Sequence, residues 1–137
     1  MTESNRAIAQ QYFDYWNAGD MDGWIGLLAD DFRLHGKGMP ISGVNHDLTR
    51  DQLGAAISKR AHLYSEPLIM TIDAIVGDGD HVVVQAHSAA RLYNGSDYAN
   101  NYSIHVHFRA GKITLMEEYC CTYSVVKLLR EQGVGLG

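Results

Sequence analysis

The sequence predicts one α+β domain over residues 1–137, in which helices pack on one face of a curved antiparallel sheet. Apolar residues recur at helical spacing in the first third of the chain. The remainder is dominated by long runs of branched and aromatic residues that glycine-containing turns separate. Helices that precede a run of antiparallel strands are typical of the α+β class, and 137 residues are enough for one domain with its own core.

The first two helices are predicted from an apolar stripe and a stop signal. Residues 4–17 form the first helix, whose stripe comprises Ile8, Tyr12, Tyr15 and Trp16. Gly19 suits the left-handed position that ends a helix, and Asp20 suits the N-cap of the next one. The second helix is therefore expected to run through residues 24–28.

A capping box and two turn signals predict the rest of the chain. Thr49-Arg50-Asp51-Gln52 opens a third helix that we expect to continue to about Tyr64. Asn94-Gly95 and Ala110-Gly111 predict tight turns between long strands. The predicted strands cover residues 31–35, 68–76, 81–93, 102–109 and 113–121, and a short closing helix covers residues 124–130.

Composition and charge exclude several classes of function. A net charge of −5 without a basic stripe argues against nucleic-acid binding. No apolar run reaches the roughly 18 residues of a membrane span, and the start MTESNRAIAQ lacks the apolar core of a signal peptide. Cys120 and Cys121 are neighbours on a predicted strand, so we expect free thiols and a reducing, cytoplasmic location. No CxxC or HExxH pattern is present, and we predict neither a metal nor a cofactor.

Two adjacent carboxylates, Glu117 and Glu118, interrupt the last strand. Because successive strand residues point to opposite faces, one of the two must lie on the core side. An apolar setting raises the pKa of a carboxyl group, since burial disfavours its charged form, and this suits it to general acid/base work. The structural alternative is a glutamate that pairs with a nearby donor or reaches the mouth of a pocket.

Two stretches of the chain resemble a known superfamily. QQYFDYWNAGDMDGWIGLLADDF and FRAGKITLMEEY are similar to the opening and closing segments of ketosteroid isomerase-like and SnoaL-like members of the NTF2-like superfamily, and the second stretch also resembles limonene-epoxide hydrolase relatives. The resemblance spans about residues 5–128. It implies a cystatin/NTF2-like cone, in which a strongly bent antiparallel sheet wraps three N-terminal helices around a deep apolar pocket. The same fold carries isomerases, cyclases, dehydratases, hydrolases and binding proteins, so it does not select an activity.

The resemblance also implies which residues face the pocket. The inward positions on two central strands are Val82, Val84, Ala86, Ser88, Ala90, Tyr102, Ile104, Val106 and Phe108. On the last strand Ile113 and Met116 are both expected to face inward, which requires a bulge between them. With that bulge Glu118 and Cys120 face inward and Glu117 faces outward. Glu118 then occupies the position of a catalytic aspartate in the hydrolase relatives.

Three residues are candidates for catalysis: Glu118, Tyr12 and His35. Tyr12 occupies the position of the isomerase's hydrogen-bonding tyrosine, where a phenol can donate to a carbonyl or enolate oxygen. The alternative is a core tyrosine whose hydroxyl binds a backbone group. His35 follows Leu34, so alternation points it away from the pocket unless the adjacent Gly36-Lys37-Gly38 loop turns it inward. The candidate substrate-binding residues are Trp16, Trp24, Ala86, Ser88, Tyr102, Ile104, Met116 and Cys120.

The chain departs from both enzyme patterns at their central residues. Gly36 stands where the isomerase has its general base, and Ile104 stands where it has a second oxyanion-binding acid. The Arg/Asp pair of the epoxide hydrolases falls at Ala86 and Ser88. Neither mechanism therefore transfers unchanged to this chain.

Two functions remain open at this point. The first is a SnoaL-like enzyme that moves protons on an apolar carbonyl compound, by cyclisation, isomerisation or dehydration. The second is a non-catalytic protein that binds a small hydrophobic molecule. Glu118 and Tyr12 favour the first, and the missing pairs favour the second. His105 and His107 are expected on the convex face of the sheet, where the resemblance implies a homodimer interface, and His46, His62, His81 and His87 are expected outside the pocket.

Overall fold

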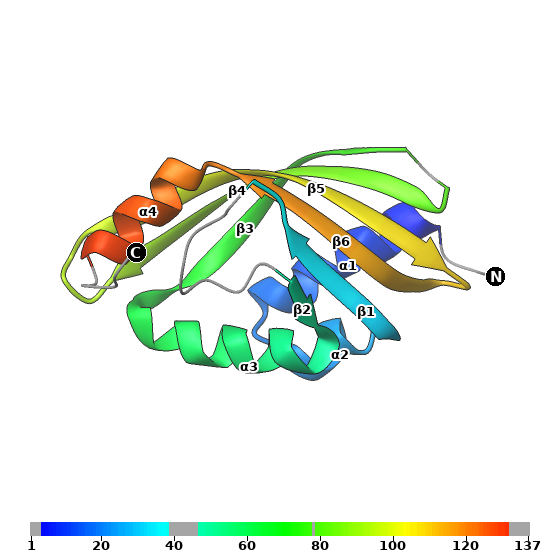
Figure 1. Ribbon diagram of the computed structural model, residues 1–137, viewed down its shortest axis with the longest axis horizontal. Coiled ribbons are helices and arrows are strands. Elements are labelled where there is room, and N and C mark those ends of the chain that lie inside the picture. The colour runs from blue at the N-terminus through cyan, green and yellow to red at the C-terminus, as the bar shows by residue number, and fades with distance from the viewer. Residues whose placement is uncertain (1–3, 39–46, 78, 132–137) are drawn as a thin grey trace.

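The computed structural model describes residues 4–38, 47–77 and 79–131. Its helical elements are α1 (Asn5–Asn17), α2 (Met21–Ile25), α3 (Arg50–Arg60), the 3-10 turn η1 (Ala61–Leu63) and α4 (Thr122–Glu131). Figure 1 shows α1, α2 and α3 on one side of the sheet and α4 at one end of the long strands. The α+β architecture predicted from the sequence is confirmed.

The helix boundaries follow the predicted caps. The Asp20 side chain accepts a hydrogen bond from Gly23 N at 2.9 Å at the start of α2, and Gly19 before it has a φ of +71°. At α3, Thr49 Oγ1 accepts from Gln52 N at 3.2 Å while Gln52 Oε1 accepts from Thr49 N at 3.0 Å, which completes the predicted capping box. α2 and α3 end earlier than expected, at Ile25 and Arg60, and Leu28 and Tyr64 belong to strands.

Six strands form one sheet across the described residues. They are β1 (Leu28–Gly36), β2 (Asp47–Thr49), β3 (Tyr64–Val76), β4 (His81–Leu92), β5 (Asp97–Arg109) and β6 (Lys112–Cys120). Their order in the sheet is β2-β1-β6-β5-β4-β3. The strands on either side of the Asn94-Gly95 and Ala110-Gly111 turns pair as predicted, and Ala110 and Gly111 both have positive φ.

The sheet departs from the prediction in its pairing and its strand lengths. β1 pairs with β6 in parallel, so the sheet is mixed rather than antiparallel throughout. No hairpin joins these two strands, and therefore no turn signal in the sequence fixes their relative direction. β3 begins before Pro67, which the sheet tolerates because β3 is an edge strand. The short strand β2 and the early start of β5 were not predicted.

The bulge expected in β6 is present. Phe108 pairs with Ile113, whereas His107 pairs with Leu115, so β6 holds one extra residue at this point. Ile113 and Met116 are consequently both buried. The bulge changes which side of the sheet every later residue of β6 faces.

The core lies between the helices and the concave face of the sheet. α1 contributes residues one helical turn apart, and β4 and β5 contribute every second residue, as their periods require. Its buried members include Ile8, Ala9, Phe13, Trp24, Phe32, Val82, Val84, Ile104, Val106, Ile113 and Met116. Asn17 fixes the end of α1 to β3, because its amide nitrogen donates to Met70 O at 2.7 Å and its amide oxygen accepts from Met70 N at 2.8 Å. A smaller cluster of Ala90, Leu92, Tyr98 and Leu128 lies under α4.

Candidate functional site

Glu118 lies on the concave side of the sheet. It pairs with Ile104 of β5, which is 2% exposed and belongs to the core. Paired residues on neighbouring strands share a face, so the Glu118 side chain leaves the sheet on the core side. The Glu118 backbone oxygen also accepts from Lys37 N at 2.9 Å, which fixes β6 to the end of β1. A half-buried carboxylate thus stands at the edge of an apolar core.

Two phenols lie within electrostatic reach of Glu118, one from a helix and one from the sheet. Burial raises the pKa of Tyr12, and the Glu118 charge raises it further. Burial likewise raises the pKa of Tyr102, with further contributions from Tyr98 and Glu118. Both phenols therefore stay protonated near neutral pH and can act as hydrogen-bond donors beside the carboxylate.

Tyr12 is held by aromatic neighbours. Its ring meets Phe13 edge-on with centroids 4.9 Å apart and Trp24 at 5.6 Å. Trp24 in turn lies 5.9 Å from Trp16, whose indole nitrogen donates to Leu68 O at 3.1 Å. Trp16, Trp24 and Tyr12 therefore form one continuous aromatic cluster, in which Trp24 belongs to the buried core.

Tyr102 belongs to a polar network on the concave face. Its hydroxyl lies 2.9 Å from Ser88 Oγ, and it is also hydrogen-bonded to Tyr98. Ser88 is 2% exposed, which is unusual for a serine. Tyr98 Oη accepts from Asn100 Nδ2 at 3.0 Å. This network, comprising Ser88, Tyr98, Asn100 and Tyr102, is hereafter called the concave polar network.

The remaining candidate substrate-binding residues lie on the same face. Ala86 pairs with Tyr102, and Tyr102 pairs with Cys120 across the next ladder. Ala86, Ile104 and Met116 are buried, and Cys120 is partly buried. Both cysteines are free thiols, as predicted.

Glu117 faces the other side and contacts His107 and Lys37. Its Oε1 lies 2.8 Å from His107 Nε2 and its Oε2 lies 3.4 Å from Lys37 Nζ. The hydrogen bond from His107 lowers the pKa of Glu117, and Lys37 adds to this effect. His107 also stacks on His81 at 4.3 Å, and His81 Nε2 lies 2.7 Å from His105 Nδ1. The predicted placement of Glu117, His105 and His107 on the convex face is confirmed.

His35 is not part of this site, which corrects its assignment as a catalytic candidate. It pairs with Glu117 of β6 and therefore lies on the convex face, while Gly36 pairs with Glu118. The His35 ring nitrogen Nε2 lies 3.4 Å from Asp47 Oδ1. Regular alternation in β1 continues through this residue, so the glycine loop does not turn it inward. His46 lies outside the described residues.

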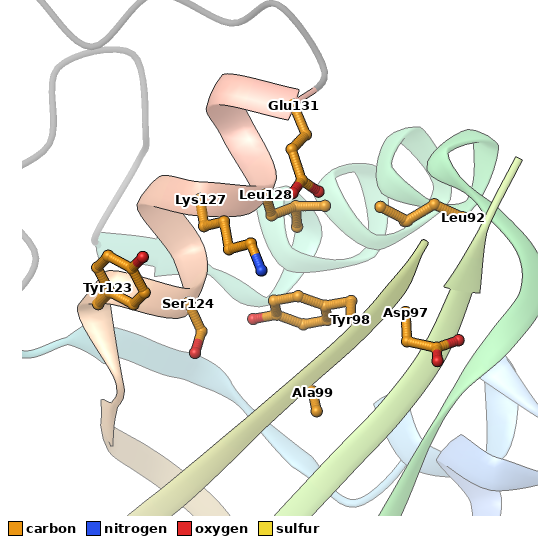
Figure 2. A pocket seen from close by; sticks show the side chains of 9 residues that line it. All are labelled: Leu92, Asp97, Tyr98, Ala99, Tyr123, Ser124, Lys127, Leu128 and Glu131. Carbon is orange, nitrogen blue, oxygen red and sulfur yellow. The ribbon is translucent and has the colours of Figure 1, made fainter. Parts of the chain in front are cut away.

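Two hollows on the surface of the described residues are lined by residues other than Glu118 and Tyr12. One, of about 590 Å³, lies between α2, β1 and the β5–β6 turn. The other, of about 230 Å³, lies between α4 and the start of β5. Figure 2 shows the Tyr98 ring on the floor of this second hollow, with Leu128 and Lys127 above it. The deep pocket expected around Glu118 stays a prediction.

Sequence reasoning missed two members of the concave polar network. Tyr98 and Asn100 precede residue 102, where the predicted strand begins, whereas β5 begins at Asp97. The signal was available, since Tyr98, Asn100 and Tyr102 follow the same two-residue period as Ile104 and Val106.

In the residues that the structure covers, no group of three or more metal-binding side chains is found. None of the helices within the same ranges is long and apolar enough to cross a membrane.

Residues 9–116 match the family model of the SnoaL-like domain. The chain belongs to the SnoaL-like family. No curated protein matches the sequence of this SnoaL-like chain.

Solved structures show that the fold is the NTF2-like cone. An NTF2-like protein of unknown function from Burkholderia pseudomallei is 19% identical with a TM-score of 0.76, covering 92% of this chain and 98% of that one. TerC, co-crystallised with polyporic acid, is 17% identical with a TM-score of 0.78, covering 90% and 96%. An LEH-like epoxide hydrolase from M. tuberculosis is 16% identical with a TM-score of 0.72, covering 93% and 92%. At these identities the likeness extends to the fold alone.

Proposed function

We propose that this SnoaL-like protein is a cofactor-independent enzyme that transfers protons on an apolar carbonyl compound. Cyclisation, isomerisation and dehydration all fit this description. The observation that supports it most directly is the half-buried Glu118 on the concave face, with the two protonated phenols of Tyr12 and Tyr102 within electrostatic reach. The carboxylate supplies the base, and the phenols supply donors for the carbonyl oxygen.

The proposed step is a proton transfer in which no other reagent takes part. Glu118 takes a proton from the carbon next to the carbonyl, so that a C–H bond breaks and an O–H bond forms on the carboxyl group. The electron pair moves onto the carbonyl oxygen, which becomes an enolate hydrogen-bonded to a phenol. The same carboxyl group then returns the proton to carbon or delivers it to a leaving hydroxyl. Trp16, Trp24, Ala86, Ser88, Ile104, Met116 and Cys120 are the proposed walls for the apolar body of the substrate.

A ketone that enolises tests this proposal without knowledge of the natural substrate. 2-Tetralone in D₂O exchanges its α-protons for deuterium, which proton NMR follows directly. We expect wild-type protein to accelerate the exchange, and Glu118→Gln to lose about a hundredfold or more of that rate. Glu117→Gln is the matched control, because Glu117 is the adjacent carboxylate on the opposite face. Equal exchange rates in wild type and Glu118→Gln would refute the role of Glu118.

The second candidate function is a non-catalytic small-molecule binder. It is favoured by the residues that stand where the isomerase and the epoxide hydrolases have their catalytic acids and bases. Gly36, Ala86, Ser88 and Ile104 carry no acid or base. Quenching of the fluorescence of Trp16 and Trp24 measures binding of 2-tetralone independently of exchange. Binding without accelerated exchange would favour the binder, and neither binding nor exchange would refute an apolar carbonyl compound as the ligand.

We also propose a homodimer through the convex face of the sheet. This face carries His81, His105 and His107, and Tyr119 beside them is 47% exposed. An exposed cluster of aromatic rings on long strands is typical of surfaces that pair with another chain. Light scattering at tens of micromolar protein, where obligate dimers persist, is expected to give twice the mass of 15.2 kDa. A monomer mass would contradict this interface.

A further inference from the structure

We propose that Tyr102 is the main hydrogen-bond donor to the ligand's developing oxyanion, and that Asn100, Tyr98 and Ser88 are positioning residues that polarise it. This inference rests on the proposed function and extends it, because it names the group that stabilises the anion and the residues behind that group. The concave face has one feature that its apolar character does not explain. A connected set of polar side chains lies there, and two of its members, Ser88 and Asn100, are each 2% exposed.

Asn100 fixes one end of the chain of hydrogen bonds. Its amide oxygen accepts from Cys121 N at 2.9 Å and from Asn101 N at 2.8 Å. Because backbone N–H groups can only donate, these two bonds determine which end of the amide is oxygen. The amide nitrogen must then face Tyr98 Oη, 3.0 Å away, and it can only donate there. The Asn100 amide nitrogen is therefore fixed as the donor to Tyr98 Oη, because a flip of the amide would break both bonds to backbone N–H groups.

The direction of the remaining bonds follows when an anion lies beside Tyr102. Tyr98 accepts from Asn100, which leaves its own O–H for Tyr102, to which it is hydrogen-bonded. Ser88 lies 2.9 Å from the Tyr102 hydroxyl and either group can donate. A negative oxygen next to Tyr102 draws the Tyr102 O–H toward itself, so that both Tyr98 and Ser88 become donors to the Tyr102 oxygen. All hydroxyls then point toward the anion.

Such an arrangement strengthens the last donor in the chain. Hydrogen bonds that run in one direction polarise one another, and their effect grows where water is excluded. Tyr102 that accepts two hydrogen bonds is a stronger donor than the same buried phenol would be without them, and it binds an oxyanion more tightly than a neutral carbonyl oxygen. This difference between the anion and the ground state is what lowers a reaction barrier. The predicted substrate is accordingly one that develops a full negative charge on oxygen, as an enolisable carbonyl compound does.

Ionisation of bound 4-nitrophenol tests the chain of donors. The background for all measurements is Glu118→Gln, because the Glu118 charge would repel an anionic probe. The visible absorbance of the phenolate gives the pKa of the bound probe, and displacement by 2-tetralone shows that both ligands share one site. We expect the pKa of bound 4-nitrophenol to lie below its value in water. Tyr102→Phe should raise it by about one to two units, the scale of a lost hydrogen bond to a charged group.

Tyr98→Phe is the decisive variant, since it removes one hydroxyl that has no direct contact with the probe. The ring that packs under Leu128 is kept, so the fold should survive. We expect a rise of about half a unit in the pKa of the bound probe, in line with partial cooperativity, and a similar rise for Ser88→Ala. Tyr93→Phe is the matched control, because Tyr93 is 75% exposed on the β4–β5 hairpin and should leave the pKa unchanged.

The outcomes separate this inference from the proposed function. If Tyr98→Phe and Ser88→Ala leave the pKa of the bound probe at the value of the Glu118→Gln background, the polarising chain is refuted. If Tyr102→Phe also leaves it unchanged, Tyr102 is not the donor, although loss of deuterium exchange in Glu118→Gln would still support the proposed proton transfer. If the probe does not bind, or if 2-tetralone does not displace it, the concave face is not the ligand site and both proposals fail.

Discussion

Asn100→Ala should weaken the fold more than any other single change of a polar side chain in the concave polar network. Four hydrogen bonds converge on this amide, with Tyr98, Asn101 N, and both the N–H and C=O of Cys121. A typical intramolecular hydrogen bond contributes about 0.5–1.5 kcal/mol net, and the bonds to Cys121 are partly open to water. The expected loss is therefore roughly 2–4 kcal/mol, against the roughly 5–15 kcal/mol that stabilises a typical domain.

The loss has a definite location as well as a size. Cys121 lies between β6 and α4, so Asn100 ties the end of β6 and the start of α4 to β5. Removal of the amide should loosen α4 first and leave the core around Phe32 and Ile113 intact. Backbone hydrogen exchange should then be faster in residues 122–131 than elsewhere in the variant.

Urea unfolding followed by circular dichroism measures the free-energy change. Asn101→Ala is the matched control, because Asn101 is the next residue, is exposed and lies on the other face of β5. Its unfolding free energy should stay within about 0.5 kcal/mol of wild type. A loss below about 1 kcal/mol for Asn100→Ala would show that water replaces the amide's partners, and the inference that Asn100 anchors the network would be wrong.

Two further predictions concern glycine and pH. Gly23→Ala should destabilise α2, although alanine is normally the better helix former by about 1 kcal/mol, because the new Cβ would lie 2.6 Å from Tyr15 Cδ1. Gly54→Ala in α3 should instead stabilise the protein, because the nearest atom to its new Cβ would be 3.4 Å away. Thermal unfolding of both variants measures the contrast. The convex face should make the unfolding free energy fall on acidification. Burial, with His107 and His105, lowers the pKa of His81 from its ordinary value of 6.5, so stability is lost as pH falls below that value toward the lower folded one. The pKa of Glu117 is lowered from 4.5, so its contribution is present above 4.5 and is lost as pH falls through the folded value. Urea unfolding across this range should show both losses, Glu117→Gln should remove the lower one, and a flat profile in wild type would contradict the assignment.

The orientation of Glu118 could be predicted from the sequence. The inward position of Glu118 depended on a bulge inferred from Ile113 and Met116, two apolar residues three apart that cannot both face inward on a regular strand. The bulge is present, and it separates Glu118 from Glu117 as expected. His35 had no such constraint, and the alternation that points it away from the pocket holds in the structure.

Local chemistry alone determined much of this protein. Caps at Asp20 and Thr49, turns at Asn94-Gly95 and Ala110-Gly111, and the two-residue period of β4 and β5 act over a few residues, so the sequence displays them directly. Only the tertiary structure decided the parallel pairing of β1 with β6 and the placement of Tyr12 and Tyr102 within electrostatic reach of Glu118. The paired residues of β1 and β6 lie 82–85 positions apart, and Tyr12 lies at least 90 positions before Tyr102 and Glu118. No short-range signal encodes which distant side chains a bent sheet brings together, because that depends on its overall curvature and on the packing of α1 against it.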